Sequence, residues 1–291
     1  LTAGCDNTSK IIEVSNGILF RDFTGNTSLS SQVYSASFSY DGNLIVITSG
    51  NKYESGESNN EVRVFNVKDG KQIQVLIGHS KLVRTAIFSN DDKLILTASD
   101  DKTARVFDVG TGKQLRLLKG HKKKIITAFF SQNNKLILTA SDDKTARVFE
   151  LSTGKQLYIF KGHKKGLTNA VFSPTCNFVL TSSWDGSARI FEMKTGKALK
   201  LFNSSETGIN MKFQFLDQNQ DGINGYKKGI KSVCFSHNEK LMLIGSYDNT
   251  LRIFELSTGN QLLLIQGPGI GFISPKLSDL IKTSRFDSRH E

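Results

Sequence analysis

The sequence predicts an all-β protein in which one antiparallel sheet unit is repeated about six times. The segment Gly78–Asp108 recurs almost unchanged as Gly120–Glu150. An arginine followed two residues later by phenylalanine recurs at an interval of about 42 residues, at Arg63, Arg105, Arg147 and Arg189, and again at Arg252 after an insertion. A weaker repeat, GCDNTSKIIEVSNG, lies near the start of the chain. Short apolar runs separated by turn residues are typical of strands.

Each repeat contains four apolar runs. In the third repeat they span residues 83–88, 93–99, 103–109 and 113–119. Asn, Asp and Gly residues stand between these runs and favour tight turns. Each repeat is therefore predicted to be a four-stranded antiparallel meander.

Such sheets are apolar on both faces, so they must pack against one another. With four strands in each period, this requirement predicts a β-propeller whose sheets are its blades. We expect one domain over residues 1–291, with blades at 33–77, 82–119, 124–161, 167–202 and 229–266 and an insertion at 203–228. A sixth blade is expected to combine residues 1–25 with the C-terminal tail, and an intact protein longer than this chain would have room for a seventh.

The order of these motifs resembles the WD-repeat family: a GH turn, an FS turn, then SxDxTxRxF followed by Asp or Glu. The family usually has Trp where this chain has Phe, at Phe65, Phe107, Phe149, Phe191 and Phe254. The resemblance implies a buried polar network in three blades, formed by His79, Ser99 and Asp101, by His121, Ser141 and Asp143, and by His163, Ser183 and Asp185. Because Phe has no N–H donor, we expect each network to end at the Ser hydroxyl.

Catalytic chemistry is not expected. A Ser, a His and an Asp together suggest a hydrolase triad, but an enzyme needs one such site and this set recurs in three repeats. The stretch from Asp217 begins like a calcium loop, yet Lys228 stands where the last carboxylate ligand belongs. We therefore expect a solvated loop there, with no metal and no cofactor. The repeated arginine is expected to take part in packing between blades.

Positions that vary between repeats are where a partner can be recognised. In a four-stranded blade, the turn after the second strand and the connection to the next blade lie on the same rim. That turn carries Asp100, Asp142, Trp184 and Tyr247, and the connections carry Lys81, Lys122, Lys123, Lys124, Lys164, Lys165, Lys227 and Lys228. We predict that these residues form a basic, partly aromatic face that binds a partner.

Two functions fit this face. The first is a non-catalytic scaffold that binds a protein or peptide, acidic or phosphorylated, during assembly of a multi-protein complex. The second is an RNA-associated propeller in ribosome assembly or RNA processing, because lysines and aromatic rings also suit nucleic acid. The 38 Lys and Arg residues exceed the 27 Asp and Glu residues, which gives a net charge of +11 and agrees with either reading.

The remaining composition is that of an ordinary globular protein. The chain has 291 residues, of which 38% are hydrophobic and 22% charged, so it can build a sizeable core. Three widely separated cysteines without a CxxC motif argue against a disulfide framework and against a thiolate zinc site, and they favour a reducing compartment. We expect an intracellular protein, cytoplasmic rather than nuclear, without a membrane contact; the oligomeric state is left open.

Overall fold

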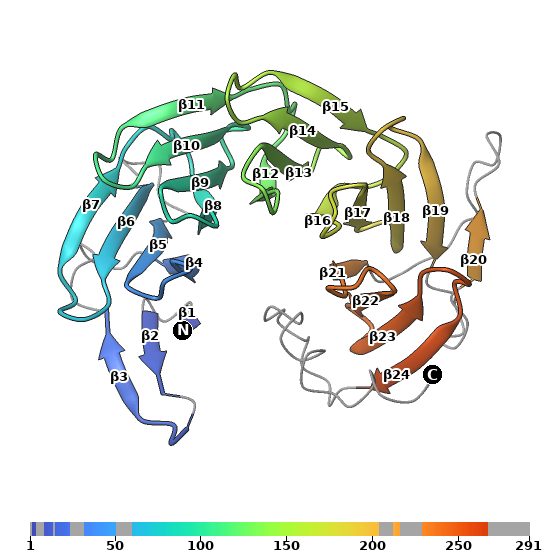
Figure 1. The fold of residues 1–291 in the computed structure, drawn as a ribbon, viewed down its shortest axis with the longest axis horizontal. Coiled ribbons are helices and arrows are strands. Elements are labelled where there is room, and N and C mark those ends of the chain that lie inside the picture. The colour runs from blue at the N-terminus through green and yellow to red at the C-terminus, as the bar shows by residue number, and fades with distance from the viewer. Residues whose placement is uncertain are drawn as a thin grey trace. The chain divides into compact units, whose positions relative to one another are not determined.

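The fold is described by a computed structural model over residues 2–3, 9–13, 15–23, 32–50, 60–203, 212–215 and 229–266. Over these residues the chain forms six antiparallel sheets and no helix (Figure 1). It follows that no described helix could cross a membrane. The prediction of an all-β fold with repeated four-stranded blades is confirmed.

The strands follow the repeats in chain order. The first sheet contains β1 (Thr2–Ala3), β2 (Ser9–Ile12) and β3 (Leu19–Asp22), and the second contains β4 (Gln32–Phe38), β5 (Leu44–Gly50), β6 (Glu61–Asn66) and β7 (Gln72–Leu76). The third contains β8 (Val83–Phe88), β9 (Leu94–Ser99), β10 (Ala104–Asp108) and β11 (Gln114–Leu118), and the fourth contains β12 (Ile125–Phe130), β13 (Leu136–Ser141), β14 (Ala146–Glu150) and β15 (Gln156–Phe160). The fifth contains β16 (Leu167–Phe172), β17 (Phe178–Ser183), β18 (Ser187–Glu192), β19 (Ala198–Asn203) and β20 (Lys212–Phe215), and the sixth contains β21 (Ile230–Phe235), β22 (Leu241–Ser246), β23 (Thr250–Glu255) and β24 (Gln261–Gln266).

The chain divides into two compact units. The first unit comprises residues 1–143 and 147–157, and the second comprises residues 144–146 and 158–291. The division passes through the sheet of β12 to β15, and the fifth and sixth sheets belong to the second unit. A single domain over the whole chain stays a prediction.

The cores lie between consecutive sheets. In the first unit, β4 and β5 lie beside β8, and Val46, Val64 and Ile95 share one buried cluster. In the second unit, β16 and β17 lie beside β21, and Phe202 packs with Phe254 at a centroid distance of 5.5 Å. In the second to sixth sheets the second strand is buried on both faces, whereas the last strand of the second, third, fourth and sixth sheets is mostly exposed or half-buried. This difference agrees with a stack of sheets whose last strands face solvent.

Backbone carbonyls and amides of one sheet are bonded by side chains of the next. From the last strand of a sheet, Gln74 Nε2 donates to Gly110 O at 2.9 Å, and Arg116 Nε donates to Ser152 O at 3.0 Å. In the turn between the first two strands, Asp92 accepts from the backbone amides of Tyr40 and Asp41 at 2.6 and 2.9 Å. These bonds add a polar contribution to the apolar packing between sheets.

Part of the expected insertion forms a strand. Within residues 203–228, β20 pairs antiparallel with β19, so the fifth sheet gains a fifth strand. The candidate calcium loop that begins at Asp217 and the C-terminal tail lie outside the described residues.

Candidate functional site

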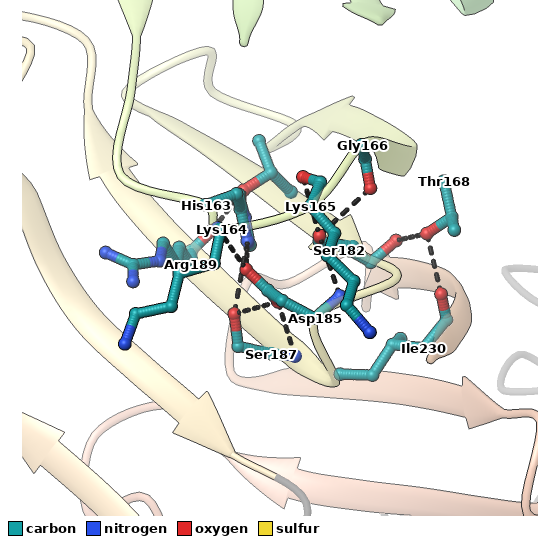
Figure 2. Close-up of polar contacts among 12 residues, drawn as sticks. His163, Lys164, Lys165, Gly166, Thr168, Ser182, Asp185, Ser187, Arg189 and Ile230 are labelled. Carbon is teal, nitrogen blue, oxygen red and sulfur yellow. Dashed lines mark hydrogen bonds and ion pairs between the residues drawn. The ribbon is translucent and has the colours of Figure 1, made fainter. Parts of the chain in front are cut away.

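The three histidine networks have the same geometry. His163 Nδ1 lies 3.0 Å from Asp185 Oδ2 (Figure 2). His163 Nε2 lies 2.8 Å from Thr181 Oγ1. The corresponding distances are 2.7 and 2.8 Å at His79 and 2.8 and 2.8 Å at His121. In each case the His comes from the turn before the first strand of its sheet. The network therefore connects this turn to the second strand, which carries the Thr, and to the turn after that strand, which carries the Asp.

The prediction of a serine as a partner of the imidazole is wrong in all three networks. The His contacts a threonine two residues before the predicted serine: Thr97, Thr139 and Thr181 take the places expected for Ser99, Ser141 and Ser183. The serine is the last residue of its strand, where its hydroxyl meets backbone instead of the imidazole. Ser183 Oγ donates to Gly166 O at 2.9 Å and accepts from Asp185 N at 3.0 Å. The predicted end of the network at the Ser hydroxyl is therefore corrected.

The sequence contained a signal for the threonine. The three repeats that have the GH histidine have Thr at this position of the second strand. The two others have Ile47 and Ile244, which pair with Arg63 and Arg252 as Thr97 pairs with Arg105. A hydroxyl occurs only where an imidazole needs a partner, since an unsatisfied polar atom in a core is costly.

The electrostatics of the network favour a neutral imidazole. Burial lowers the pKa of His163, and this effect outweighs the hydrogen bond and charge of Asp185, which raise it. Burial alone would raise the pKa of Asp185, but the hydrogen bonds from His163 and Ser187 hold it far below its usual range. Nδ1–H therefore donates to the carboxylate, and Nε2 accepts from the Thr181 hydroxyl. A buried, fully bonded set of this kind stabilises a turn.

The repeated arginine hydrogen-bonds within its own sheet, and its expected part in packing between blades stays a prediction. Arg105 Nη1 donates to Gln114 Oε1 at 2.6 Å, between two adjacent strands. Its guanidinium also covers Gly78, where an added Cβ would clash with Nη1. Gly78 has a φ of 147°, so the glycine of the GH turn is required both by conformation and by this close approach.

The variable turn positions share one backbone scaffold. The amide of Asp100 donates to Leu82 O at 2.9 Å, that of Trp184 to Gly166 O at 3.1 Å, and that of Tyr247 to Gly229 O at 3.0 Å. Asp142 makes the same bond to Lys124 O at 3.0 Å. Four repeats therefore hold three kinds of side chain, Asp, Trp and Tyr, at an equivalent place, as the repeat pattern predicted.

In the first unit, the two acids of this set already have basic partners. Arg84 Nη2 donates to Asp100 Oδ2 at 2.9 Å, and Lys123 Nζ lies 4.0 Å from Asp142 Oδ2. Arg84, which starts from the first strand, was not among the predicted site residues. Its guanidinium offsets the negative charge of Asp100.

In the second unit, Trp184 and Tyr247 form an aromatic stack. Their ring centroids are 4.6 Å apart with an interplanar angle of 24°, and Trp184 is 43% exposed. Lys231 Nζ lies 5.8 Å from the centroid of Tyr247, and burial raises the pKa of that phenol. A Cβ at Gly229 would be 2.9 Å from both Cα and Cε3 of Trp184, so glycine is needed beneath the indole. The sequence placed both aromatics in exposed turns but did not predict the stack or Lys231.

The lysines of the predicted site are exposed where the structure describes them, except Lys124, which is half-buried. In the first unit these are Lys81, Lys122 and Lys123, and in the second unit Lys164 and Lys165. The backbone amides of Lys122 and Lys164 donate to Asp143 and Asp185, so the histidine networks hold the start of each lysine segment. Lys227 and Lys228 lie outside the described residues. Over the residues that are described, no group of three or more His, Cys, Asp or Glu side chains is arranged to hold a metal ion.

Comparison with known proteins agrees with this architecture. The family model of the WD domain, G-beta repeat, matches residues 70–108, 112–150, 154–192 and 218–255. A search of curated protein sequences finds no match to the chain. The family matches cover more than half of the sequence. The chain therefore belongs to the WD40 repeat family.

Proposed function

We propose that the protein is a non-catalytic scaffold that binds an acidic or phosphorylated protein segment through the Trp184–Tyr247 stack and the neighbouring turn that carries Lys164 and Lys165. WD40 repeats in general form protein-interaction scaffolds. The observation that carries the specific proposal is the stack itself. A large apolar ring that is 43% exposed beside exposed lysines suits a partner with an apolar anchor and negative charge.

The stack is prepared for binding before a partner arrives. The indole of Trp184 packs on Gly229 and stacks on the ring of Tyr247. The backbone amide of Trp184 donates to Gly166 O. A ring fixed in this way loses little conformational entropy on binding. The lysines contribute mainly to the rate of encounter and to the choice of partner.

The test is replacement of Trp184 by Ala in the complete protein. We expect loss of the co-purifying partners, measured by quantitative mass spectrometry, with little change in melting temperature because the indole is at the surface. Tyr40→Ala is the matched control, since Tyr40 is 84% exposed and only its backbone is bonded to Asp92. Unchanged partners in Trp184→Ala would contradict the assignment.

RNA is the second candidate, favoured by the exposed indole next to Lys164 and Lys165. Bases stack on exposed aromatic rings, and lysines neutralise phosphates. Filter binding across a salt series distinguishes the two candidates: phosphate contacts give a steep loss of affinity with salt. Nuclease treatment before affinity purification separates partners that are bridged by RNA from those bound directly. A cytoplasmic location stays a prediction.

A further inference from the structure

A cavity of about 610 Å³ lies between the fifth and sixth sheets, which are adjacent in the second unit (Figure 1). Its apolar wall is formed by the described residues Phe178, Ile190, Leu199, Phe235 and Leu256. Its polar lining consists of Lys200, Glu239, Lys240, Glu255 and Ser257. Small-molecule sites are typically clefts of about 300–1,000 Å³ with mostly apolar walls and a few polar groups. The cavity therefore has the size and lining of a ligand site.

The position of Lys200 is occupied differently in the first unit. Lys200 lies opposite Ile190, at the last pair before the register of the outer strand shifts. The same register position holds Arg21, Gln74 and Arg116 in the first, second and third sheets. These planar side chains donate to the turn of the following sheet, at Lys68 O, Gly110 O and Ser152 O. A guanidinium or an amide group thus covers this turn in three sheets.

The ammonium group of Lys200 bonds to a different carbonyl. Its Nζ donates to Leu256 O, which belongs to the residue before the one used in the first unit. Ser257, the equivalent of Gly110 and Ser152, lines the cavity. The place beside Ser257 that a planar group covers in the other sheets is therefore part of the cavity.

The two carboxylates of the lining already serve the fold. Glu239 Oε1 accepts from Thr175 N at 2.5 Å, which connects the turns of two adjacent sheets. Glu255 accepts from the Thr258 hydroxyl within its own turn. The same bond recurs in the turns of the fourth and fifth sheets, between Glu150 and Thr153 and between Glu192 and Thr195. These acids are accounted for by turn structure.

The two lysines favour an anion. Lys240 is exposed, and within the described part of the chain its ammonium group forms no ion pair. Burial lowers the pKa of Lys200, because its charged form loses hydration. An anion in the cavity offsets this cost, whereas a cation adds to it. The net charge of +11 also favours anionic ligands.

We propose that this cavity binds a small amphiphilic anion, an alkyl or aryl carboxylate. Its apolar body lies against Phe178, Leu199 and Phe235, and its carboxylate lies beside Lys200 and Lys240. The cavity is lined by the turns after the first and third strands of the sixth sheet, whereas Tyr247 follows the second strand. Turns of these two kinds lie at opposite ends of an antiparallel meander, so this site is independent of the proposed function.

Isothermal titration calorimetry of the full chain with decanoate tests the proposal. The comparison ligand is decyltrimethylammonium, which has the same alkyl chain and the opposite charge, and both are used below the concentrations at which they form micelles. We expect saturable binding of decanoate at one site. Its affinity should exceed that of the cation at least about tenfold, the effect of one close charge pair.

Replacement of the lysines tests the charged part of the site. Lys200→Met with Lys240→Met keeps two long apolar side chains and removes both charges, so decanoate should bind about tenfold more weakly. Lys240→Met alone should show part of this loss at an unchanged melting temperature, because Lys240 is exposed. The control is Lys135→Met. Lys135 is an exposed lysine at the equivalent turn position of the fourth sheet, and it should be replaceable without effect on decanoate.

Filling the cavity tests its apolar part. Ser257→Phe places a ring at an exposed turn position that lines the cavity, so it should weaken decanoate binding about tenfold with little change in melting temperature. Ser152→Phe at the equivalent turn of the fourth sheet is the matched control and should bind like the unmodified protein.

Several results would overturn the proposal. These are absence of saturable decanoate binding, equal affinity for decanoate and the cation, unchanged binding by the double lysine variant, or equal losses in Ser257→Phe and Ser152→Phe. Self-association that Ser257→Phe abolishes would identify a second copy of the chain as the occupant and would also reject a small-molecule site.

Discussion

The imidazole of His163 lies between a carboxylate and a hydroxyl in the interior of its sheet. Its side chain is 2% exposed, and Thr181 is fully buried. Because His163 Nε2 cannot reach water, it depends on the Thr181 hydroxyl for its hydrogen bond. The contribution of the pair is therefore measured best by removing one partner.

Thr181→Val should lower the free energy of unfolding by about 1–3 kcal/mol, because His163 Nε2 loses its donor while it stays buried. Chemical denaturation followed by circular dichroism gives this value.

Thr48→Val is the matched control. Thr48 is also fully buried, but its hydroxyl has no hydrogen-bond partner. Replacing it by a methyl group of similar size should leave stability unchanged or raise it. Equal losses in the two variants would contradict a special role for the histidine network.

At the scale of elements, the turn between the first and second strands of one sheet is hydrogen-bonded to the corresponding turn of the preceding sheet. Asp92 lies in the left-handed region with a φ of 57°, which Asp tolerates better than most residues. Its carboxylate accepts two backbone amides of the preceding turn. In the second unit, Glu239 occupies the same turn position with a φ of 56° and accepts from Thr175 N at 2.5 Å.

Asp92→Ala should therefore destabilise the protein by about 1 kcal/mol, because two backbone amides lose their acceptor at a partly solvated site. Asp92→Asn keeps one acceptor oxygen and tolerates the same backbone conformation, so it should recover part of the loss. The two variants are compared by thermal unfolding. A larger loss of stability in Asp92→Asn than in Asp92→Ala would contradict a stabilising role for these hydrogen bonds between turns.

At the scale of the whole molecule, the buried networks make stability depend on pH. Burial lowers the folded-state pKa values of His121 and His163 below the ordinary value of 6.5. Between the folded and unfolded pKa values, the unfolded chain binds protons that the folded chain does not. Stability is thus fully present above about pH 6.5 and is lost as the pH falls through the folded pKa values.

The carboxylates act in the same direction at lower pH. Asp101 and Asp185 have folded-state pKa values well below the ordinary 3.8; burial opposes this shift, but the hydrogen bonds from His and hydroxyl groups exceed it. Their contribution is present above about pH 4 and is lost as the pH falls further.

Urea unfolding at a series of pH values from 8 to 5 tests the histidine part. We expect the midpoint to fall below about pH 6.5, and we expect a smaller fall in the double variant His121→Gln, His163→Gln, which has no imidazole to protonate at these places. An increase in stability on acidification from pH 7 to 5.5 would contradict the assignment.

Much of this architecture is present in the sequence because it depends on local pattern. The interval of the repeated arginine, the alternation of apolar residues and the Asn, Asp and Gly turns are properties of neighbouring residues, and they predicted the four-stranded sheets. They also placed Trp184 and Tyr247 at equivalent turns, since one backbone scaffold serves every repeat.

Tertiary structure decided which side chains meet. The contact of His163 with Thr181 instead of Ser183 depends on how far the GH turn reaches along a strand. The stack of Trp184 on Tyr247 depends on two adjacent sheets and on Gly229 between them. The pairing of β20 with β19 joins an insertion to an edge that no periodic pattern marks. By itself, the sequence determined the repeat, its strands and its variable turns; contacts across sheets required the fold, because they depend on distances between residues far apart in the chain.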